Sequence, residues 1–436
     1  MSLRRIASSL LVGGALIIVA TQADAGGFAV REQSAYGQGS SYAGIAAGGA
    51  LSSMFWNPAT MTQTPGFAVE GDFAGIMPVA SQSPLPGSTL FALGGVSNSA
   101  ERALVPSFYA SYQINPDFWI GMSFNAPYGL SVGFPDIWAG RNYAENTSLR
   151  TYTATPMLAW RINEMISVGV GVQIQYGEAD LNRGLVLPPA TLLTTNLSGN
   201  GWAWGVTAGV TLKPTAGTTI GLGWRSQMDQ KIDGTFNVPP VIPGSTPGDV
   251  STKLKLPDIV SFGVRQVITP QWTLLGTVEW SNWSRIGTSA VNAGGGPALV
   301  AGVPVTIPFD YKDGWLFSLG AEYQWSPTIA VRGGIGYEIS PITDSVRIPL
   351  LPDNDRLWLS AGLTAAITNT LKLDVAYSHL FVRDTNVNVG PGNPSFNPLL
   401  GTYFGTVDSH IDIVTVALRW TPWEPPAPVR TSLPVK

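Results

Sequence analysis

The most constraining feature of this sequence is a two-residue alternation that recurs in segments of about ten residues. In residues 202–212, Trp, Val, Ala and Leu at even positions alternate with Ala, Gly and Thr at odd positions. Residues 166–177 and 315–325 repeat the pattern. Because a β-strand points successive side chains to opposite faces, each segment predicts a strand with one apolar face and one small or polar face.

Composition indicates where the apolar faces go. Charged residues make up 12% of the chain, about half of the usual ~25%, and the chain holds 15 Trp. No stretch after residue 25 approaches the ~20 apolar residues of a membrane-spanning helix. Only helices and closed barrels satisfy every backbone polar group in lipid. The sequence therefore predicts an all-β transmembrane antiparallel barrel with its apolar faces toward lipid.

About fourteen alternating segments follow one another, an even number as bacterial outer-membrane barrels have. We expect strands near residues 66–78, 103–115, 117–129, 147–162, 166–180, 202–213, 218–236, 251–268, 271–285, 312–326, 328–340, 356–368, 371–384 and 409–420. Short connectors predict periplasmic turns, and long Pro/Gly/Asn-rich connectors at 79–102, 181–201, 237–250, 286–311 and 385–408 predict extracellular loops. In this register Val170, Trp204, Val206 and Phe317 face lipid, whereas Gln173, Glu322 and Asp374 face inward.

Residues 26–63 lack the alternation and are rich in Gly, Ala and Ser. Small side chains bury too little apolar area to offset the entropy of ordering the backbone, so this segment cannot form its own core. We expect it to be a hatch that plugs the lumen of a barrel formed by residues 64–421. Inward-facing polar residues would bond the hatch to the wall, and a role in binding a ligand head group stays open for any of them: Glu70, Asp72, Gln173, Gln175, Glu279, Glu322, Arg332, Glu338, Lys372 and Asp374.

The two ends of the chain indicate where the protein is sent in the cell and where the barrel stops. Arg4 and Arg5 precede an apolar run at residues 10–20, and Ala23-Asp24-Ala25 resembles a signal-peptidase site, so residues 1–25 read as a signal peptide. Its removal changes the formal charge from 24 − 28 = −4 to 22 − 27 = −5, which argues against a nucleic-acid partner. Residues 422–436 form a Pro-rich tail that cannot join a ladder as an interior strand.

Little in the sequence points to covalent chemistry. There is no Cys, no G-x-S-x-G or H-E-x-x-H motif, and only two histidines, His379 and His410. We expect no cofactor and no metal site. An outer-membrane lipase or esterase built on His379 or His410 stays open, because catalytic triads are assembled in space rather than in sequence.

One strand breaks its own pattern. Residues 118–125 alternate, and then Ala126-Pro127-Tyr128-Gly129 intervenes before Leu130. Proline removes a ladder donor and glycine permits a bend, so pairing with one neighbour should stop here. The pattern is consistent either with an opening in the barrel wall or with a strand that simply ends at Asn125.

Several short motifs, in this order, resemble the hatch of the FadL/TodX-type outer-membrane transporters of long-chain fatty acids and aromatic hydrocarbons. They are Gly26-Gly27-Phe28, Glu32-x-Ser34, Gly37-x-Gly39, Tyr42-Ala43-Gly44 and Asn57-Pro58-Ala59. The similarity continues at Tyr128-Gly129-Leu130 and at Trp280-Ser281-Asn282-Trp283-Ser284.

The resemblance implies a fourteen-stranded barrel that passively transports hydrophobic molecules and releases them through a lateral opening in the third strand. Carried over by position, it assigns Phe28 to the internal binding site, Asn57, Pro58 and Ala59 to the hatch, and Ala126, Pro127 and Gly129 to the opening. We expect that opening beside the Asn57-Pro58-Ala59 motif. The expected partners are a hydrophobic small molecule and outer-membrane lipids, with a monomeric protein. The sequence is also compatible with a general aqueous porin and with an adhesin or purely structural barrel.

Overall fold

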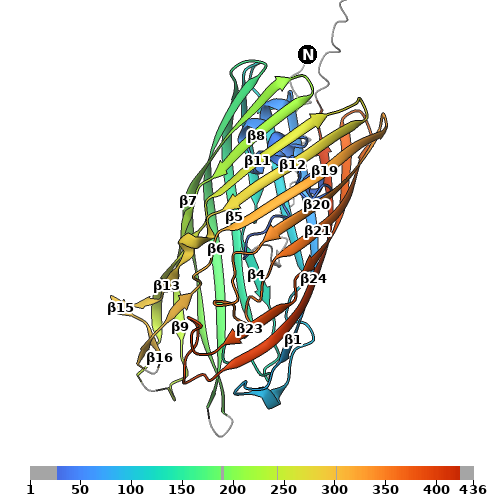
Figure 1. Ribbon diagram of the computed structural model, residues 1–436. Coiled ribbons are helices and arrows are strands. Elements are labelled where there is room, and N and C mark those ends of the chain that lie inside the picture. The colour runs from blue at the N-terminus through green and yellow to red at the C-terminus, as the bar shows by residue number, and fades with distance from the viewer. Residues whose placement is uncertain (1–26, 188–190, 243, 301, 423–436) are drawn as a thin grey trace, which may run out of the picture.

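The computed structural model describes residues 27–187, 191–242, 244–300 and 302–422. The predicted signal peptide and nearly all of the predicted tail lie outside these residues. Fourteen antiparallel strands close into a tilted barrel, as the sequence predicts (Figure 1). The last strand pairs with the first from Trp420↔Val69 to Gly405↔Pro84, so the sheet has no open edge there. Within the described residues, no helix is long and apolar enough to cross a membrane.

Some of the fourteen strands of the barrel wall, here called staves, consist of two shorter strands separated by an irregularity. The order is β1 (Phe67–Pro84), β2 (Ala103–Gln113), β3 (Phe118–Asn125) with β4 (Gly129–Val132), β5 (Thr147–Arg161), β6 (Ile166–Leu187), β7 (Thr191–Thr215), β8 (Thr218–Arg225) with β9 (Met228–Asn237), β11 (Ile259–Val267) with β10 (Gly248–Leu256), β12 (Trp272–Ser281), β19 (Gly314–Ser326), β20 (Ile329–Ile339), β21 (Arg356–Ala366), β22 (Leu371–Val382) and β24 (Tyr403–Trp420).

The remaining elements belong to the loops. They are η4 (Phe91–Leu93), η5 (Trp283–Ile286), β13 (Thr288–Ala290), β14 (Asn292–Ala293), β15 (Gly296–Pro297), β16 (Leu299–Val300), β17 (Val303–Pro304), β18 (Thr306–Pro308) and β23 (Thr385–Val389). Figure 1 places β9, β13, β15 and β16 at the end of the barrel opposite the hatch, which we assign as the extracellular end.

The predicted register is confirmed by exposure. Trp204 is 64% exposed and Val170 is 55% exposed on the outer wall, whereas Gln173 and Asp374 are fully buried. Apolar side chains cover the outer wall, whereas the interior combines buried polar residues with apolar residues of the hatch and the inner wall. An apolar exterior is what a barrel in lipid requires.

The expected loop at residues 181–201 is mostly strand, and this corrects the sequence analysis. β6 and β7 continue as a ladder from Ile166↔Leu212 to Leu187↔Thr191. The lipid-facing pattern ends at Tyr176, because the outward residues beyond it include Glu178 and Asp180. Outside the membrane a hairpin can keep its backbone pairing without an apolar face. The ladder therefore continues beyond the residues whose apolar alternation predicted the strands.

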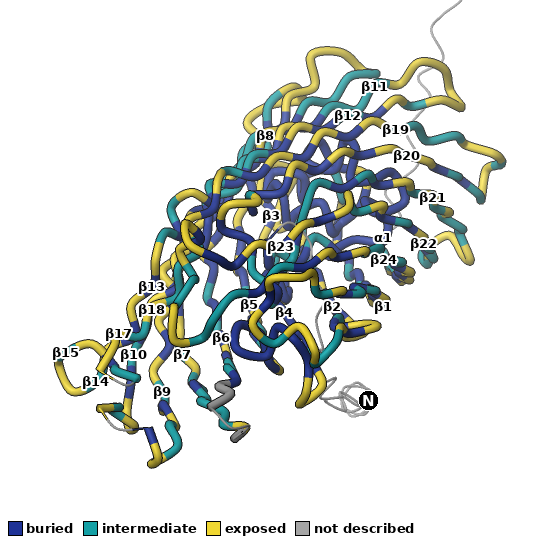
Figure 2. Tube along the Cα trace, turned by 60° about the horizontal axis from the view of Figure 1, so that its bottom comes forward, coloured by how far each residue is buried: buried dark blue, intermediate teal, exposed yellow. Residues whose placement is uncertain are grey.

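The hatch lies inside the barrel, where Figure 2 shows it almost entirely buried. It contains α1 (Ala35–Gln38) and the 3₁₀ helices η1 (Ile45–Ala47), η2 (Leu51–Phe55) and η3 (Pro58–Gln63). Glycines of the wall let its backbone approach closely: a Cβ at Gly223 would lie 1.8 Å from the carbonyl oxygen of Trp56. Small residues on both sides therefore allow the hatch to fill the lumen.

Candidate functional site: a break in the barrel wall

The wall is interrupted at the predicted kink. β3 pairs with both of its neighbours, β2 and β5, but β4 pairs with β5 alone. Pairing of β3 with β2 ends at Phe124↔Phe108. The chain rejoins the β1–β2 connection only at the isolated bridge between Val132 and Ala100. A stretch of wall therefore lacks its ladder between these two points.

Both sides of the break depart from regular strand geometry. On the β5 side, the three residues 126–128 face two residues, 151 and 152, because Asn125 pairs with Thr153 and Gly129 with Arg150. This is a β-bulge, which bends a strand and interrupts its pairing. On the other side, extending the β2–β3 register by two residues places Pro106 opposite Ala126. Pro106 lacks an N–H donor, as does Pro127, so the two strands are poorly suited to pair here.

The N-terminal segment, which we define as residues 27–33, supplies the missing backbone partners from inside the barrel. The Val30 N–H donates to the Pro127 carbonyl at 2.8 Å, and the Gly129 N–H donates to the Phe28 carbonyl at 2.8 Å. Ala29 forms an isolated antiparallel bridge with Tyr128. An unpaired backbone is costly in lipid unless it meets protein or lines a cavity. The segment thus closes the break by acting as a short internal strand.

Gln33 reinforces this closure with its side chain. Its Nε2 donates to the Ala126 carbonyl at 3.0 Å, and its Oε1 accepts from Ser107 Oγ at 2.7 Å and from Asn125 Nδ2 at 3.0 Å. The Tyr109 hydroxyl donates to the Gln33 carbonyl at 2.6 Å. One buried amide therefore bridges β2, β3 and the kink.

An aromatic cluster lies on the lumen side of the break. The ring of Phe28 lies 4.7 Å from that of Trp283, 6.4 Å from that of Tyr128 and 6.1 Å from that of Phe309, measured between centroids. Tyr311 extends the cluster, 6.2 Å from Trp283. Phe28, Tyr128 and Trp283 are each at most 3% exposed. Such a cluster offers an apolar ligand a large contact area directly behind the break.

Buried charges hold the N-terminal segment next to this cluster. Arg31 pairs with Glu279 at 2.6 Å and with Glu338 at 2.8 Å. Burial opposes ionisation of Arg31, but the two carboxylates raise its pKa above the usual value. Glu32 is 2% exposed, and its Oε2 has no hydrogen-bond partner among the described residues. Burial raises the pKa of Glu32 to about 7.

The Asn57-Pro58-Ala59 motif lies elsewhere in the lumen than we expected. Asn57 caps η3 by accepting from the Ala59 N–H at 3.0 Å, and its Nδ2 donates to Val210 on β7 at 2.9 Å. Pro58 and Ala59 approach Gly169 on β6. The motif anchors the hatch to β6 and β7, whereas residues 28–33 contact the break. The Asn57-Pro58-Ala59 motif and the break are therefore connected through residues 34–56 of the hatch, and the motif does not lie beside the break as we expected.

The hatch body, residues 34–63, has a second anchor around Tyr36. The Tyr36 hydroxyl donates to Glu322 at 2.8 Å and accepts from Arg265 at 2.7 Å, and the Arg332 guanidinium lies 3.9 Å above its ring. Arg332 also pairs with Asp374 at 3.4 Å, and Asp374 pairs with Arg419 at 2.7 Å. The predicted bonding of inward-facing charges to the plug is thus present in the structure.

Both histidines face outward, away from the lumen. His379 Nδ1 lies 2.8 Å from Asp412 Oδ1, which also accepts from the Tyr377 hydroxyl at 2.6 Å. The His410 ring stacks at 5.8 Å from that of His379. Among the described residues, no serine hydroxyl is hydrogen-bonded to either ring. No group of three or more His, Cys, Asp or Glu is placed to hold a metal ion in the described parts of the chain.

Sequence reasoning missed Gln33, Pro106, Phe309 and the role of Trp283 behind the break. Pro106 carried a usable signal, since a proline in an otherwise regular strand removes a ladder donor. Trp283 stood in a motif noted only for its resemblance. Gln33 gave no local signal, because its partners Ser107 and Asn125 are more than 70 residues away in the chain.

Comparison with known proteins identifies the family of the chain. Residues 16–419 match the family model described as outer membrane protein transport protein (OMPP1/FadL/TodX). The long-chain fatty acid transport protein of Salmonella typhi is 27% identical over 433 residues, covering 90% of this chain and 95% of that protein. The protein of the same name from Escherichia coli K12 is 26% identical over 436 residues, covering 90% and 96%.

Solved structures show the same fold. A FadL homologue from Pseudomonas aeruginosa superposes with a TM-score of 0.80 at 21% identity, covering 90% of this chain and 99% of that one. The toluene transporter TodX of Pseudomonas putida gives a TM-score of 0.66 at 13% identity, with coverage of 90% and 99%. The resemblance seen in the short motifs is confirmed, and the chain belongs to the outer membrane protein transport protein family (OMPP1/FadL/TodX).

Proposed function

We propose that this protein is a passive channel for hydrophobic molecules, and that substrate leaves it sideways through the break between β2 and the β3–β4 stave. Members of the family are outer-membrane transport proteins rather than enzymes, and the protein is a multi-pass barrel of the outer membrane. The observation that carries the lateral route is the missing β2–β4 ladder, which is replaced by hydrogen bonds to the N-terminal segment.

The break and the aromatic cluster suit a substrate that is apolar over most of its surface. A molecule among Phe28, Tyr128 and Trp283 is already next to the wall opening. Passage into lipid gains ~25 cal/mol per Å² of apolar surface relative to a watery exit. Withdrawal of the N-terminal segment alone would clear the route, because the hatch body makes its own bonds to the wall.

The relatives suggest two substrate classes, long-chain fatty acids and monoaromatic hydrocarbons. The proteins named for fatty acid transport match about 90% of this chain at 26–27% sequence identity, which favours long-chain fatty acids for this chain. A general aqueous porin is disfavoured, because the hatch fills the lumen with buried residues.

Removal of Pro127 tests the lateral route. The deletion leaves two residues facing two across the bulge, so the third strand should run straight toward β2. We expect the variant to reach the outer membrane and bind fatty acid, but to lose most uptake of labelled oleate by cells. Deletion of one residue in an exposed loop, Gly295, is the matched control. Full uptake by a correctly folded Pro127 deletion would show that substrate passes through the hatch instead.

A further inference from the structure

The outer wall formed by β5, β6 and β7 changes character at a single row of side chains. Exposed apolar residues, among them Val170, Val172 and Val206, cover the part of this wall nearer the hatch end of the barrel. The row Tyr152, Tyr176 and Trp202 follows, with the three residues paired side by side. Aromatic rows of this kind mark the boundary between hydrocarbon and head groups.

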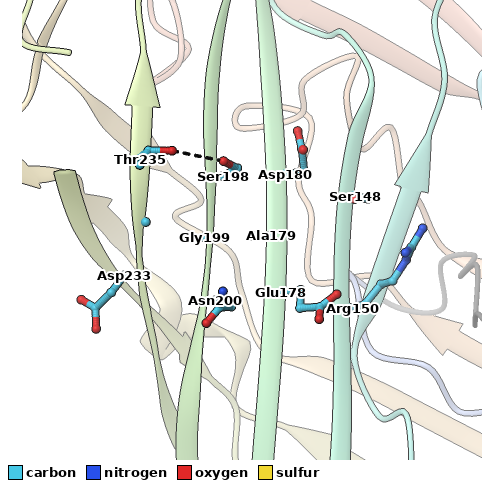
Figure 3. Close-up of a pocket in the computed structure, with 11 residues that line it drawn as sticks. Ser148, Arg150, Glu178, Ala179, Asp180, Ser198, Gly199, Asn200, Asp233 and Thr235 are labelled. Atoms are coloured by element: carbon cyan, nitrogen blue, oxygen red, sulfur yellow. Dashed lines mark hydrogen bonds between the residues drawn. The ribbon is translucent and has the colours of Figure 1, made fainter. Parts of the chain in front are cut away.

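Directly beyond the aromatic row, the same face becomes a polar trough. Two successive rows of outward side chains form its sides: Arg150, Glu178, Asn200 and Asp233 in the first, and Ser148, Asp180, Ser198 and Thr235 in the second. The backbone of Ala179, Gly199 and Gly234 forms the floor between them. The trough encloses about 440 Å³, which is within the ~300–1,000 Å³ typical of ligand sites (Figure 3).

The two rows differ in how far their hydrogen bonds are used. In the second row Asp180 accepts from Asn196 at 2.9 Å, and Ser198 and Thr235 contact each other at 3.4 Å. In the first row, no hydrogen bond or ion pair is found among the described residues for the side chains of Arg150, Glu178 and Asn200. The row next to the membrane boundary therefore keeps unused donors and acceptors.

Charge and position limit what can occupy this trough. Three carboxylates line it against the single guanidinium of Arg150, and Lys231 is already paired with Asp233 at 2.8 Å. A phosphate or sulfate ligand would meet net repulsion, whereas sugar hydroxyls and amines can bond to carboxylates and amides. Trp202, 60% exposed at the edge of the trough, offers an aromatic surface to a sugar ring.

We propose that this trough binds the saccharide head group of a glycolipid in the outer leaflet, with the acyl chains lying along the apolar wall. The polar face is continuous with the lipid-facing face across the Tyr152–Tyr176–Trp202 row, so one amphipathic molecule spans both. The β5 end of the trough adjoins the break, since Arg150 pairs with Gly129. Glu178 and Asn200, which the test below changes, lie on β6 and β7, so head-group binding can be measured apart from the lateral exit.

The test uses the intact protein in detergent micelles with two probes, purified lipopolysaccharide and the same glycolipid after removal of its phosphates, which should bind at least as well. Native mass spectrometry counts bound glycolipid during a titration. Combined substitutions Glu178→Ala and Asn200→Ala remove the unused groups, and we expect binding to weaken about tenfold, the loss of one to two hydrogen bonds. The control variant, Asn386→Ala with Asp408→Ala, removes exposed polar groups from β23 and β24, and its binding should match that of the parent.

Three outcomes would overturn the proposal. Equal binding by the trough variant and the parent would mean that the apolar wall alone retains the lipid. Failure of the deacylated saccharide to compete, while phospholipid does compete, would lead to the same conclusion. Loss of binding on addition of EDTA would mean that divalent cations bridge phosphates to the carboxylates, contrary to direct sugar recognition. Unchanged heat-modifiable migration of each variant on gels confirms that the barrel is folded.

Discussion

The two parts of the hatch are attached to the same barrel by different kinds of bond. The hatch body is fixed by side-chain hydrogen bonds of Tyr36 and Asn57, those of Tyr36 being to the charged wall residues Glu322 and Arg265. The Arg225 guanidinium also lies 4.0 Å above the ring of Phe55. At the break the N-terminal segment is fixed by backbone bonds from Val30 and to Phe28, and by Gln33. Away from the break, Arg31 pairs with Glu279 of β12 and Glu338 of β20.

This difference distinguishes a part of the hatch that stays in the lumen from a part that can move. Breaking a buried ion pair leaves a charge without a partner and costs about 3–5 kcal/mol, so Arg31 stays on β12 and β20. Hydrogen bonds from the hatch body to charged groups of the wall, at about 1.5–3 kcal/mol each, oppose its departure. Backbone hydrogen bonds contribute about 1 kcal/mol net each and can be exchanged for bonds to another chain segment or to water. The comparison therefore predicts that the N-terminal segment moves away from the break about Arg31 as a fixed point, while the hatch body stays in place.

The largest effect should follow from damage to the anchor of the hatch body. Arg332→Ala leaves Asp374 and Glu322 short of one buried cation, and we expect a loss of about 3–5 kcal/mol in the free energy of unfolding. The thermal midpoint should fall, and planar bilayers should show ion-conducting openings that the parent lacks. Arg383→Ala, at an exposed loop position, is the matched control. An unchanged midpoint in Arg332→Ala would remove the distinction between the two parts.

Fixing the N-terminal segment to the wall should abolish transport without unfolding. Ala29 and Tyr128 form a non-hydrogen-bonded antiparallel pair, because the bonds run between their neighbours Val30 and Pro127, and Gly129 and Phe28. Such pairs have Cα atoms about 4.5 Å apart, within the range of a disulfide. The natural chain contains no Cys, so a pair of introduced cysteines can form a disulfide only with each other.

We therefore expect Ala29→Cys with Tyr128→Cys to stop fatty acid uptake when oxidised and to regain it after reduction. The reduced form serves as its own control for loss of the Tyr128 ring. Equal uptake by the oxidised and reduced forms would show that the segment need not move.

A smaller effect should follow from removal of the Gln33 amide. Gln33→Ala leaves Ser107 and Asn125 without a shared partner and should weaken docking of the segment by about 2 kcal/mol. Hydrogen exchange at the Val30 and Gly129 amides should become about 30-fold faster. Gln63→Ala removes a matched bond of the hatch body, from Gln63 Nε2 to the Ala47 carbonyl at 2.8 Å, and should leave those two amides unchanged. Protection that persists in Gln33→Ala would mean that the backbone bonds alone hold the segment.

The barrel wall and the docked N-terminal segment also differ in how far the sequence could predict them. Fourteen strands and their register were predictable, because lipid imposes an apolar exterior with period two. The extracellular extension of the β6–β7 hairpin was not, since that pattern ends outside the membrane. Pro127 disclosed the kink locally, but the docking of Phe28 and Gln33 onto it depends on contacts over 70 residues or more, which no local pattern records. The roles assigned to Phe28, Asn57 and Ala126 stay predictions.

The finest test of the comparison uses the pH dependence of docking. Glu32 belongs to the N-terminal segment and is buried next to Arg31, Glu338 of β20 and Arg356 of β21. Its pKa is about 7 in the docked segment and 4.5 when free, so docking favours the protonated form. The stabilisation is therefore complete below pH 4.5 and is lost as the pH rises through 7. The full difference corresponds to about 3 kcal/mol, since each tenfold change is 1.36 kcal/mol.

We expect amide exchange at Val30 to accelerate between pH 5 and pH 8 beyond the intrinsic base-catalysed increase, and fatty acid uptake to rise modestly over the same interval. Glu32→Gln keeps the shape of the protonated carboxyl but cannot ionise, so its docking should be insensitive to pH and its Val30 protection at pH 8 should exceed that of the parent. Amides of the hatch body, such as that of Ala59, should show no such difference between the two proteins. If Glu32→Gln retains the full pH dependence of the parent, another group governs docking. If the Ala59 amide responds as strongly as the Val30 amide, the hatch opens as one unit and the distinction between its two parts is wrong.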